Sequence, residues 1–183
     1  MKIISILALV LAVFSAFSQT YDEKLAYVRK HYALIEKNLE NYSEREYIYQ
    51  PDSNYAPYAY YKFWYYEDGH LAKAERTMGE EGYYTEESFY YADGKFIFYF
   101  EHSEEPVWTE EGEMNHDIYE SRAYFYDEIM FEYFTKELKS TENKDISEIA
   151  NQKYKWTETD QSNLIESAAD AVDFSSKAIL NNN

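Results

Sequence analysis

Hydrophobic and polar positions alternate along much of the chain between residues 58 and 135, and most of the hydrophobic positions are aromatic. Alternation of this kind is typical of strands whose two faces differ. Because the alternating segments follow one another closely, an antiparallel meander is the simplest connectivity. Five or six strands are expected, at 59–66, 71–78, 83–91, 95–102, 118–126 and 129–135, and residues 45–50 have the pattern of a short additional edge strand.

Asp-Gly pairs at 68–69 and 93–94 mark two hairpins, because two-residue turns need positive φ. Two-residue turns would set the register of both hairpins. The predicted neighbours are Tyr66 with Leu71, Trp64 with Lys73, Lys62 with Glu75, Phe63 with Ala74, Tyr61 with Arg76, Phe89 with Phe98, Tyr91 with Phe96 and Glu86 with Glu101. Since two carboxylates would then face each other, the second hairpin is expected to bulge or splay at its open end.

An aromatic pair, a turn and an alternating strand recur around 64–73 and 89–98, and a degraded copy occupies 124–129. In the degraded copy Glu128 replaces the glycine, so a longer turn or another turn type is expected there. The clear copies are carried by Tyr65, Tyr66, Gly69 and Leu71 and by Tyr90, Tyr91, Gly94 and Phe96. They resemble variant repeats, with a Tyr-Tyr-x-x-Gly-x-Leu core, of small exported bacterial proteins of unknown role. The resemblance implies a hairpin fold and no activity.

Helical periodicity flanks the sheet region on both sides. Thr20 and Glu23 have the spacing of a capping box, and hydrophobic residues follow at steps of three and four, so a helix over 19–43 is expected. It would lie across its own sheet or form a coiled-coil seam with another chain, and its short length favours the sheet. A polar connection (136–157) precedes a second helix, 158–180, which Asp160 can cap. Its expected buried stripe is Leu164, Ile165, Ala168, Val172 and Ile179.

These elements predict one α+β domain, residues 19–183, in which both helices pack on one face of the meander. Tyrosine dominates the other face. The pattern leaves two interpretations of that face open, a wet binding platform and a buried second layer, and a homodimer through the same face is a third outcome.

Residues 1–18 have the features of a signal peptide: Lys2, an apolar run over 3–14, and Ala16-Phe17-Ser18 as a cleavage site. The apolar run is too short to span a bilayer, and no cysteine follows that could carry a lipid. We therefore expect a soluble protein, exported to the periplasm or the exterior, without membrane insertion.

The net charge is −18, with 35 acidic against 17 basic residues. A field of this sign repels phosphate backbones, so nucleic acid is not an expected partner. The absence of cysteine excludes a thiol nucleophile and disulfide bonds. The glycines lie in turn contexts, so no phosphate-binding loop is expected.

The longest expected connection in the sheet is 101–117, which has seven carboxylates and no Lys or Arg. Its candidate binding residues are Trp108, His102 and His116, and the indole could stack on a sugar or a protein partner. The alternative is a solvated acidic loop with Trp108 folded onto the body. The stretch lacks the pattern of a calcium loop, and Glu113-x-x-His116 is a single copy of a metal-binding spacing, so neither a metal nor another cofactor is expected.

The function predicted from these features is non-enzymatic binding or structural interaction outside the cytoplasm, with a protein or a glycan as partner. The aromatic sheet face or the acidic stretch would make the contact, and no catalytic residue is singled out. The alternative is a hydrolase that uses two carboxylates. Carboxylates of raised pKa in a concave pocket would favour the enzyme, and a flat tyrosine-lined face would favour the binding domain.

Overall fold

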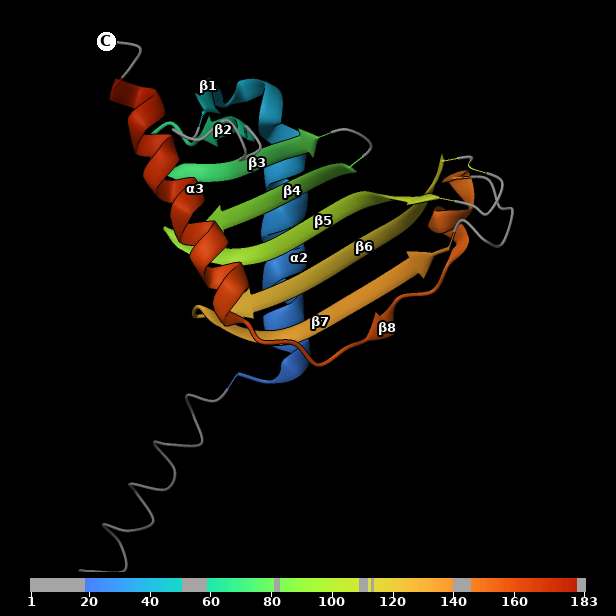
Figure 1. The fold of residues 1–183 in the computed structure, drawn as a ribbon. Helices are drawn as coiled ribbons and strands as arrows, with labels where there is room; N and C mark the ends of the chain where they lie inside the picture. The colour runs from blue at the N-terminus through green and yellow to red at the C-terminus, as the bar shows by residue number, and fades with distance from the viewer. Residues whose placement is uncertain are drawn as a thin grey trace, which may run out of the picture.

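The computed structural model describes residues 19–50, 59–80, 83–108, 112, 114–139 and 146–180, so the expected signal peptide at 1–18 lies outside the described residues. One antiparallel sheet runs in sequence order from β1 to β8 (Figure 1). The strands are β1 (Ser43–Tyr49), β2 (Ala59–Tyr65), β3 (Leu71–Glu80), β4 (Tyr83–Ala92), β5 (Lys95–Trp108), β6 (Met114–Tyr126), β7 (Ile129–Leu138) and β8 (Lys155–Trp156). The helices are α2 (Tyr21–Asn38), α3 (Ser162–Leu180) and the 3-10 helices η1 (Leu39–Asn41) and η3 (Ile146–Asn151).

The meander is antiparallel as predicted, but the sheet has eight strands, and the prediction of five or six is wrong. Strands β2 to β7 correspond to the six predicted segments. The additional strands are the two edges: β1, near the predicted segment 45–50, pairs with β2, and β8 pairs with β7 through two residues. Six of the seven residues of β1 are exposed, as befits an edge strand, and β8 is too short to show a period.

Three hairpins, β2–β3, β4–β5 and β6–β7, share a one-residue shift of register close to the turn. In each hairpin one residue of the second strand has no partner on the first, namely Ala72, Ile97 and Phe131. A bulge of this kind turns two neighbouring side chains toward one face of the sheet. All three extra residues lie in or against the hydrophobic cluster beneath α2. The bulges therefore form part of the surface on which α2 rests.

The first hairpin keeps its predicted register except beside the turn. Tyr66 N–H donates to the carbonyl oxygen of His70 at 2.9 Å, so the turn is longer than two residues and Tyr65, not Tyr66, faces Leu71. The longer turn and the bulge at Ala72 compensate for each other. The confirmed pairs are Trp64 with Lys73, Lys62 with Glu75, Phe63 with Ala74 and Tyr61 with Arg76.

The second hairpin has the predicted two-residue turn, with φ of 53° at Asp93 and 73° at Gly94. Tyr91 faces Phe96, as predicted. The bulge at Ile97 lies beside the turn and not at the open end, and it moves every later pair by one residue. The corrected pairs are Phe89 with Tyr99, in place of Phe98, and Glu87 with Glu101, in place of Glu86.

The third hairpin also turns in two residues, with φ of 53° at Asp127 and 63° at Glu128. The prediction of a longer turn or another type is wrong. Pairing of Tyr126 with Ile129 on either side holds the glutamate in the left-handed region despite its side chain.

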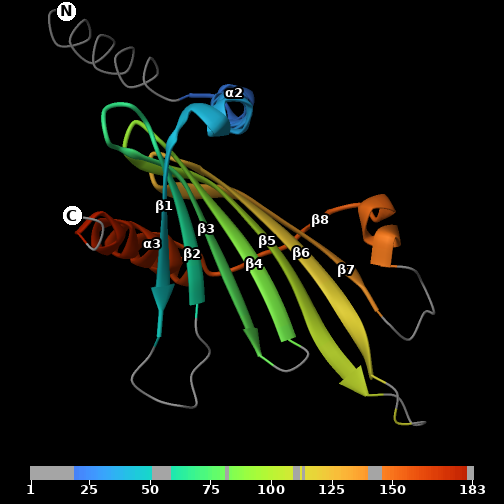
Figure 2. The ribbon, with the colours of Figure 1, turned by 90° about the horizontal axis from the view of Figure 1, so that it is seen from above.

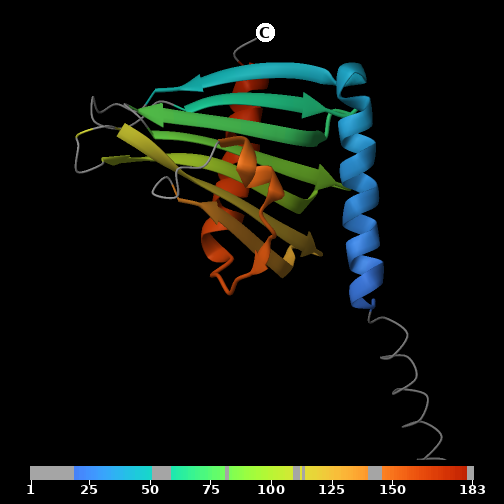
Figure 3. The same ribbon diagram turned by 90° about the vertical axis from the view of Figure 1, so that its right-hand side faces the viewer.

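The two long helices cover opposite faces of the sheet, which corrects the prediction that both pack on one face (Figures 2 and 3). On one face Val28 and Ile35 of α2 pack in the cluster that contains the bulge residues. On the other face, Ala168 and Ala171 of α3 pack against alternate aromatic residues of the strands. Because large rings occupy both faces, each face gains from a covering helix. The tyrosine-rich face is thus a partly covered second layer.

The chain changes face by passing around the β7 edge of the sheet. Within η3, Ile149 packs with Ile118 and Leu138 on the α2 side. β8 then pairs with β7, and α3 follows on the opposite face. The expected polar connection at 136–157 therefore contains the end of β7, η3 and β8.

The helix starts agree with the sequence. Thr20 N–H donates to Glu23 Oε2 at 2.8 Å, and Glu23 N–H donates to Thr20 Oγ1 at 3.3 Å, which completes the capping box of α2. Because α2 lies across its own sheet, the coiled-coil alternative is set aside. Asp160 Oδ1 accepts a hydrogen bond from Ser162 N–H at 2.9 Å at the start of α3. No helix in the described ranges has the length and hydrophobicity needed to cross a bilayer.

The buried face of α3 differs from the predicted stripe. Ala168 is buried and Leu164 packs against the cluster, as predicted, whereas Ile165 and Val172 are exposed. The side chain of Ile179 lies outside the described residues. The remaining buried positions of the helix are Ala171, Ser175 and Ala178. Small side chains allow the helix to approach the aromatic face closely, and two larger residues of α3, Leu164 and Phe174, pack against the same cluster.

Candidate functional site

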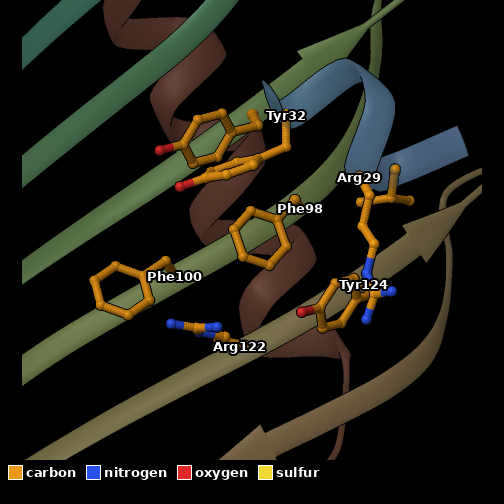
Figure 4. Close-up of a pocket in the computed structure, with 8 residues that line it drawn as sticks. Arg29, Tyr32, Phe98, Phe100, Arg122 and Tyr124 are labelled. Atoms are coloured by element: carbon orange, nitrogen blue, oxygen red, sulfur yellow. The ribbon is translucent and has the colours of Figure 1, made fainter. Parts of the chain in front are cut away.

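A cavity of about 330 Å³ lies between α2 and the sheet (Figure 4). Four elements contribute to it: α2, β4, β5 and β6. Five of its eight lining residues are aromatic, and both charged ones are arginines. The lining residues are Val28, Arg29, Tyr32, Tyr90, Phe98, Phe100, Arg122 and Tyr124.

The register of β5 with β6 sets the floor of the cavity. Phe98 lies opposite Tyr124, and Phe100 lies opposite Arg122. Residues two apart on a strand point to the same face, so these four side chains are neighbours on the α2 side. The ring centroids of Phe98 and Tyr124 are 5.0 Å apart. The floor is thus a continuous aromatic surface with one guanidinium set into it.

Helix α2 forms the opposite wall. Val28 and Tyr32 are one helical turn apart and point to the same side. The ring centroid of Tyr32 is 5.3 Å from that of Phe98, in an edge-to-face arrangement. Arg29 is exposed, and in Figure 4 its side chain extends from α2 toward the sheet, on the side of Tyr124. The wall therefore places a second guanidinium at the rim.

Tyr90 joins the wall to the floor. Its hydroxyl donates to Glu36 Oε1 of α2 at 2.8 Å, and Lys73 Nζ lies 2.8 Å from the same oxygen. Lys73 also lies 5.0 Å from the centroid of the Tyr90 ring. Burial, with the negative charge of Glu36, raises the pKa of Tyr90, so the hydroxyl remains protonated. This group fixes the distance between α2 and the sheet.

Arg122 lies between two aromatic rings. Its Cζ atom is 5.6 Å from the ring centroid of Phe100 and 4.3 Å from that of Tyr154. Its Nε atom is buried and has no hydrogen-bond partner among the described residues. Within the described ranges neither Arg122 nor Arg29 pairs with a carboxylate, whereas Arg76 pairs with Glu87. The buried Nε–H of this guanidinium is therefore a donor that another group could use.

Tyr154 is itself fixed to the sheet. Its hydroxyl donates to Glu120 Oε2 at 2.8 Å, and Lys136 Nζ lies 2.7 Å from the same oxygen. Burial would raise the pKa of Glu120, but the hydrogen bonds from Lys136 and Tyr154 outweigh burial and lower it. A charged Glu120 therefore holds the ring of Tyr154 against Arg122.

The stretch 101–117 is largely strand and not the long loop that its composition predicts. β5 continues to Trp108 and β6 begins at Met114, so the two strands extend together. Polar residues occupy both faces of this extension, which hides the period of two that reveals a strand. The acidic-loop interpretation of the sequence is wrong for these residues.

The three candidate binding residues do not line the cavity. His102 lies 3.4 Å from Glu104 and 3.7 Å from Glu120, measured between ring nitrogens and carboxylate oxygens. His116 lies on β6, and Trp108 is 69% exposed at the end of β5. By register all three point to the same side of the β5–β6 extension, but they are spread along it.

Two carboxylates face each other on the opposite side of the sheet, Glu87 on β4 and Glu101 on β5. The hydroxyl oxygen of Tyr99 lies 2.8 Å from Glu87 Oε1 and 3.2 Å from Glu101 Oε2. Ser121 Oγ donates to Glu101 at 2.9 Å, and Arg76 pairs with Glu87. Burial raises the pKa of Glu101; the hydrogen bond from Ser121 opposes this shift, and the charge of Glu87 adds to it.

Among the described residues no group of three or more His, Asp or Glu side chains is arranged to hold a metal ion. The arginines of the cavity were not singled out from the sequence. Two features of the sequence could have drawn attention to Arg122. It is one of only four arginines in the chain, and it shares a strand face with Tyr124.

Comparison of the chain with protein-family models, curated proteins and solved structures found no match.

Proposed function

We propose that this protein is an exported binding protein that holds a small planar ligand in the cavity between α2 and the sheet. The observation that supports the proposal is the cavity itself, about 330 Å³ with five aromatic rings in its walls. Ligand sites are concave, mostly apolar and roughly 300–1,000 Å³ in volume. A flat ring system would stack on the floor of Phe98 and Tyr124 and meet the edge of Tyr32.

The lining favours binding over catalysis. None of the eight lining residues is His, Asp, Glu, Ser or Lys, the side chains that most often act as base or nucleophile. Tyr90 has a raised pKa, and its proton is donated to Glu36, so its hydroxyl does not serve as a base. The wall is also partly preformed, since a hydrogen bond to Glu36 fixes Tyr90 in place. Preformed walls reduce the entropy lost on binding.

The hydrolase alternative would rest on Glu87 and Glu101. Glu87 is only 5% exposed and is engaged by Arg76 and Tyr99. The cavity beneath α2 includes neither carboxylate. A substrate would have to displace these partners, so we assign the pair no catalytic role.

A second candidate function is contact with a protein or glycan through Trp108. Its indole is 69% exposed, and Met114, which lies opposite, is 46% exposed. Trp156, 64% exposed, provides a matched control. Loss of glycan or peptide binding in Trp108→Ala, but not in Trp156→Ala, would support this second function. Equal binding by both variants would rule it out.

Three probes of one shape test the cavity: 2-naphthoate, 2-naphthalenemethanol and 2-naphthylmethylamine. Each is titrated into the purified protein, and binding is followed by calorimetry and by NMR signals of aromatic residues. We expect at least one probe to bind and to shift the signals of Tyr32 and Phe98. Tyr32→Ala should weaken that binding roughly 2- to 10-fold, the range for one aromatic contact.

Tyr83→Ala is the matched control, because Tyr83 and Tyr32 are both 39% exposed and Tyr83 does not line the cavity. Binding of the best probe should be unchanged in this variant. If none of the three probes bound, or if Tyr32→Ala and Tyr83→Ala behaved alike, the proposed function would be wrong.

A further inference from the structure

We infer that the ligand carries an acidic group, a carboxylate, sulfonate or phosphate, and that Arg122 binds this group with help from Arg29. The inference rests on the proposed function, because it assigns a chemical class to the ligand of the same cavity. The observation that carries it is the charge of the lining, since both charged lining residues are arginines.

The arginines are unusual in this chain. The protein has 35 acidic residues against 17 basic ones, so a basic side chain has many carboxylates within reach. Arg76 and Lys73 follow that rule and pair with carboxylates. Arg122 and Arg29 form no such pair among the described residues. Two guanidiniums without carboxylate partners among the described residues therefore bring positive charge to one cavity of an acidic protein.

The geometry of Arg122 suits an anion at the end of a planar body. The rings of Phe100 and Tyr154 lie near its Cζ atom at 5.6 and 4.3 Å and limit its motion. Its buried Nε–H lacks a partner among the described residues, and a buried donor without a partner costs free energy. An acidic oxygen that accepts from Nε–H and a neighbouring N–H would satisfy it in a bidentate arrangement.

The position of Arg122 defines the orientation of the ligand. Phe98 and Tyr124 lie next to Phe100 and Arg122 on the same sheet face, nearer to the hairpin turns at 93–94 and 127–128. These two rings form the stacking floor. A planar ring on that floor would point its substituent along the strands toward Phe100 and Arg122. Arg29, exposed on α2, lies at the rim and would contact the same acidic group or attract it from solvent. We therefore expect Arg122 to contribute more affinity than Arg29.

The three naphthalene probes separate the charge of the ligand from its shape. The carboxylate should bind roughly 10- to 100-fold more tightly than the alcohol, as expected for charge-assisted hydrogen bonds, and the amine most weakly. Arg122→Gln should remove the preference for the carboxylate, so that the carboxylate and the alcohol bind within about twofold of each other. Arg29→Gln should reduce the preference by a smaller factor. Arg45→Gln, at an exposed arginine of β1 outside this cavity, is the matched control and should change nothing.

The outcomes distinguish the inference from the proposed function. Equal binding of carboxylate and alcohol, or tightest binding of the amine, would overturn the acidic ligand and leave the cavity as a binding site. Binding of none of the probes would overturn both. If the carboxylate is preferred, repeating the titration with 2-naphthyl phosphate and 2-naphthalenesulfonate identifies which acidic group the arginines favour.

Discussion

Glu87 and Glu101 lie directly opposite each other on β4 and β5, and the hydroxyl of Tyr99 is within hydrogen-bond distance of both carboxylates. One hydroxyl proton can serve one carboxylate at a time. Arg76 pairs with Glu87, so Glu101 is the carboxylate that is left with the weaker set of partners. Its raised pKa expresses the cost of burying this charge.

We predict that Glu101→Gln stabilises the protein near neutral pH by roughly 0.5–1.5 kcal/mol. The amide can accept from Ser121 and donate to Tyr99, and Tyr99 can then donate to Glu87. In the natural protein the folded pKa of Glu101 lies above its unfolded value, taken as 4.5. The raised pKa of Glu101 therefore adds to the free energy of unfolding in full below the unfolded pKa. This contribution is lost as the pH rises through the folded pKa. Urea unfolding at several pH values measures the difference.

Glu105→Gln is the control for this experiment, because Glu105 is an exposed carboxylate of the same strand. It should leave the free energy of unfolding nearly unchanged at every pH. A Glu101→Gln variant that is less stable than the natural protein at neutral pH would show that the charge of Glu101 holds the strands together.

The turn of the third hairpin offers a second prediction. Glu128 has a φ of 63°, whereas the equivalent position of the second hairpin is Gly94 with a φ of 73°. The left-handed conformation costs a residue with a side chain roughly 1–2 kcal/mol, part of which the greater freedom of an unfolded glycine offsets. Glu128→Gly should therefore raise the free energy of unfolding by about 0.5–1 kcal/mol.

Gly94→Ala is the matched change in the opposite direction. A Cβ at Gly94 would meet no atom within 4 Å, so any loss of stability in that variant comes from the backbone. Thermal unfolding of both variants should show shifts of opposite sign. If Glu128→Gly lowered the melting temperature, interactions of the Glu128 side chain would outweigh the strain.

Tyr154 positions Arg122, and the two functions of its side chain can be separated. Tyr154→Phe keeps the ring near Arg122 and loses the hydrogen bond to Glu120. Tyr154→Leu loses both. We expect binding of 2-naphthoate to weaken roughly 3- to 10-fold in the leucine variant and less in the phenylalanine variant, because the ring holds the guanidinium.

The control for these variants is the neutral probe. Since Tyr154 does not line the cavity, both variants should bind 2-naphthalenemethanol as the natural protein does. A parallel loss of the alcohol and the carboxylate would mean that Tyr154 shapes the whole cavity and does not act through Arg122.

Local pattern predicts much of this fold. The alternation of aromatic residues gives β2 to β7. The pairing of Trp64 with Lys73 agrees with the prediction because the longer turn and the bulge at Ala72 compensate for each other. What the sequence does not reveal is the bulge, because the extra residues Ala72, Ile97 and Phe131 look like ordinary strand positions. Their effect appears only when α2 rests on them. The pairing of Glu87 with Glu101 follows from one such bulge and could not be derived from turn length alone.

The placement of the helices depends on long-range packing in the same way. Both helices are amphipathic, and the sequence does not say which face of the sheet each one covers. The deciding feature is the path around the β7 edge, where β8 pairs through two residues. The same path brings Tyr154, from the segment between η3 and β8, to Arg122. Residues that are 32 positions apart in the chain, 122 and 154, thus meet at the candidate site.

The most direct test is a crystal structure of the protein with 2-naphthoate bound. We expect the naphthalene ring on the floor formed by Phe98 and Tyr124, and the carboxylate within hydrogen-bond distance of the Arg122 guanidinium. A ring bound elsewhere on the surface, or a carboxylate directed to solvent away from both arginines, would contradict the assignment of this cavity as a site for a planar acid.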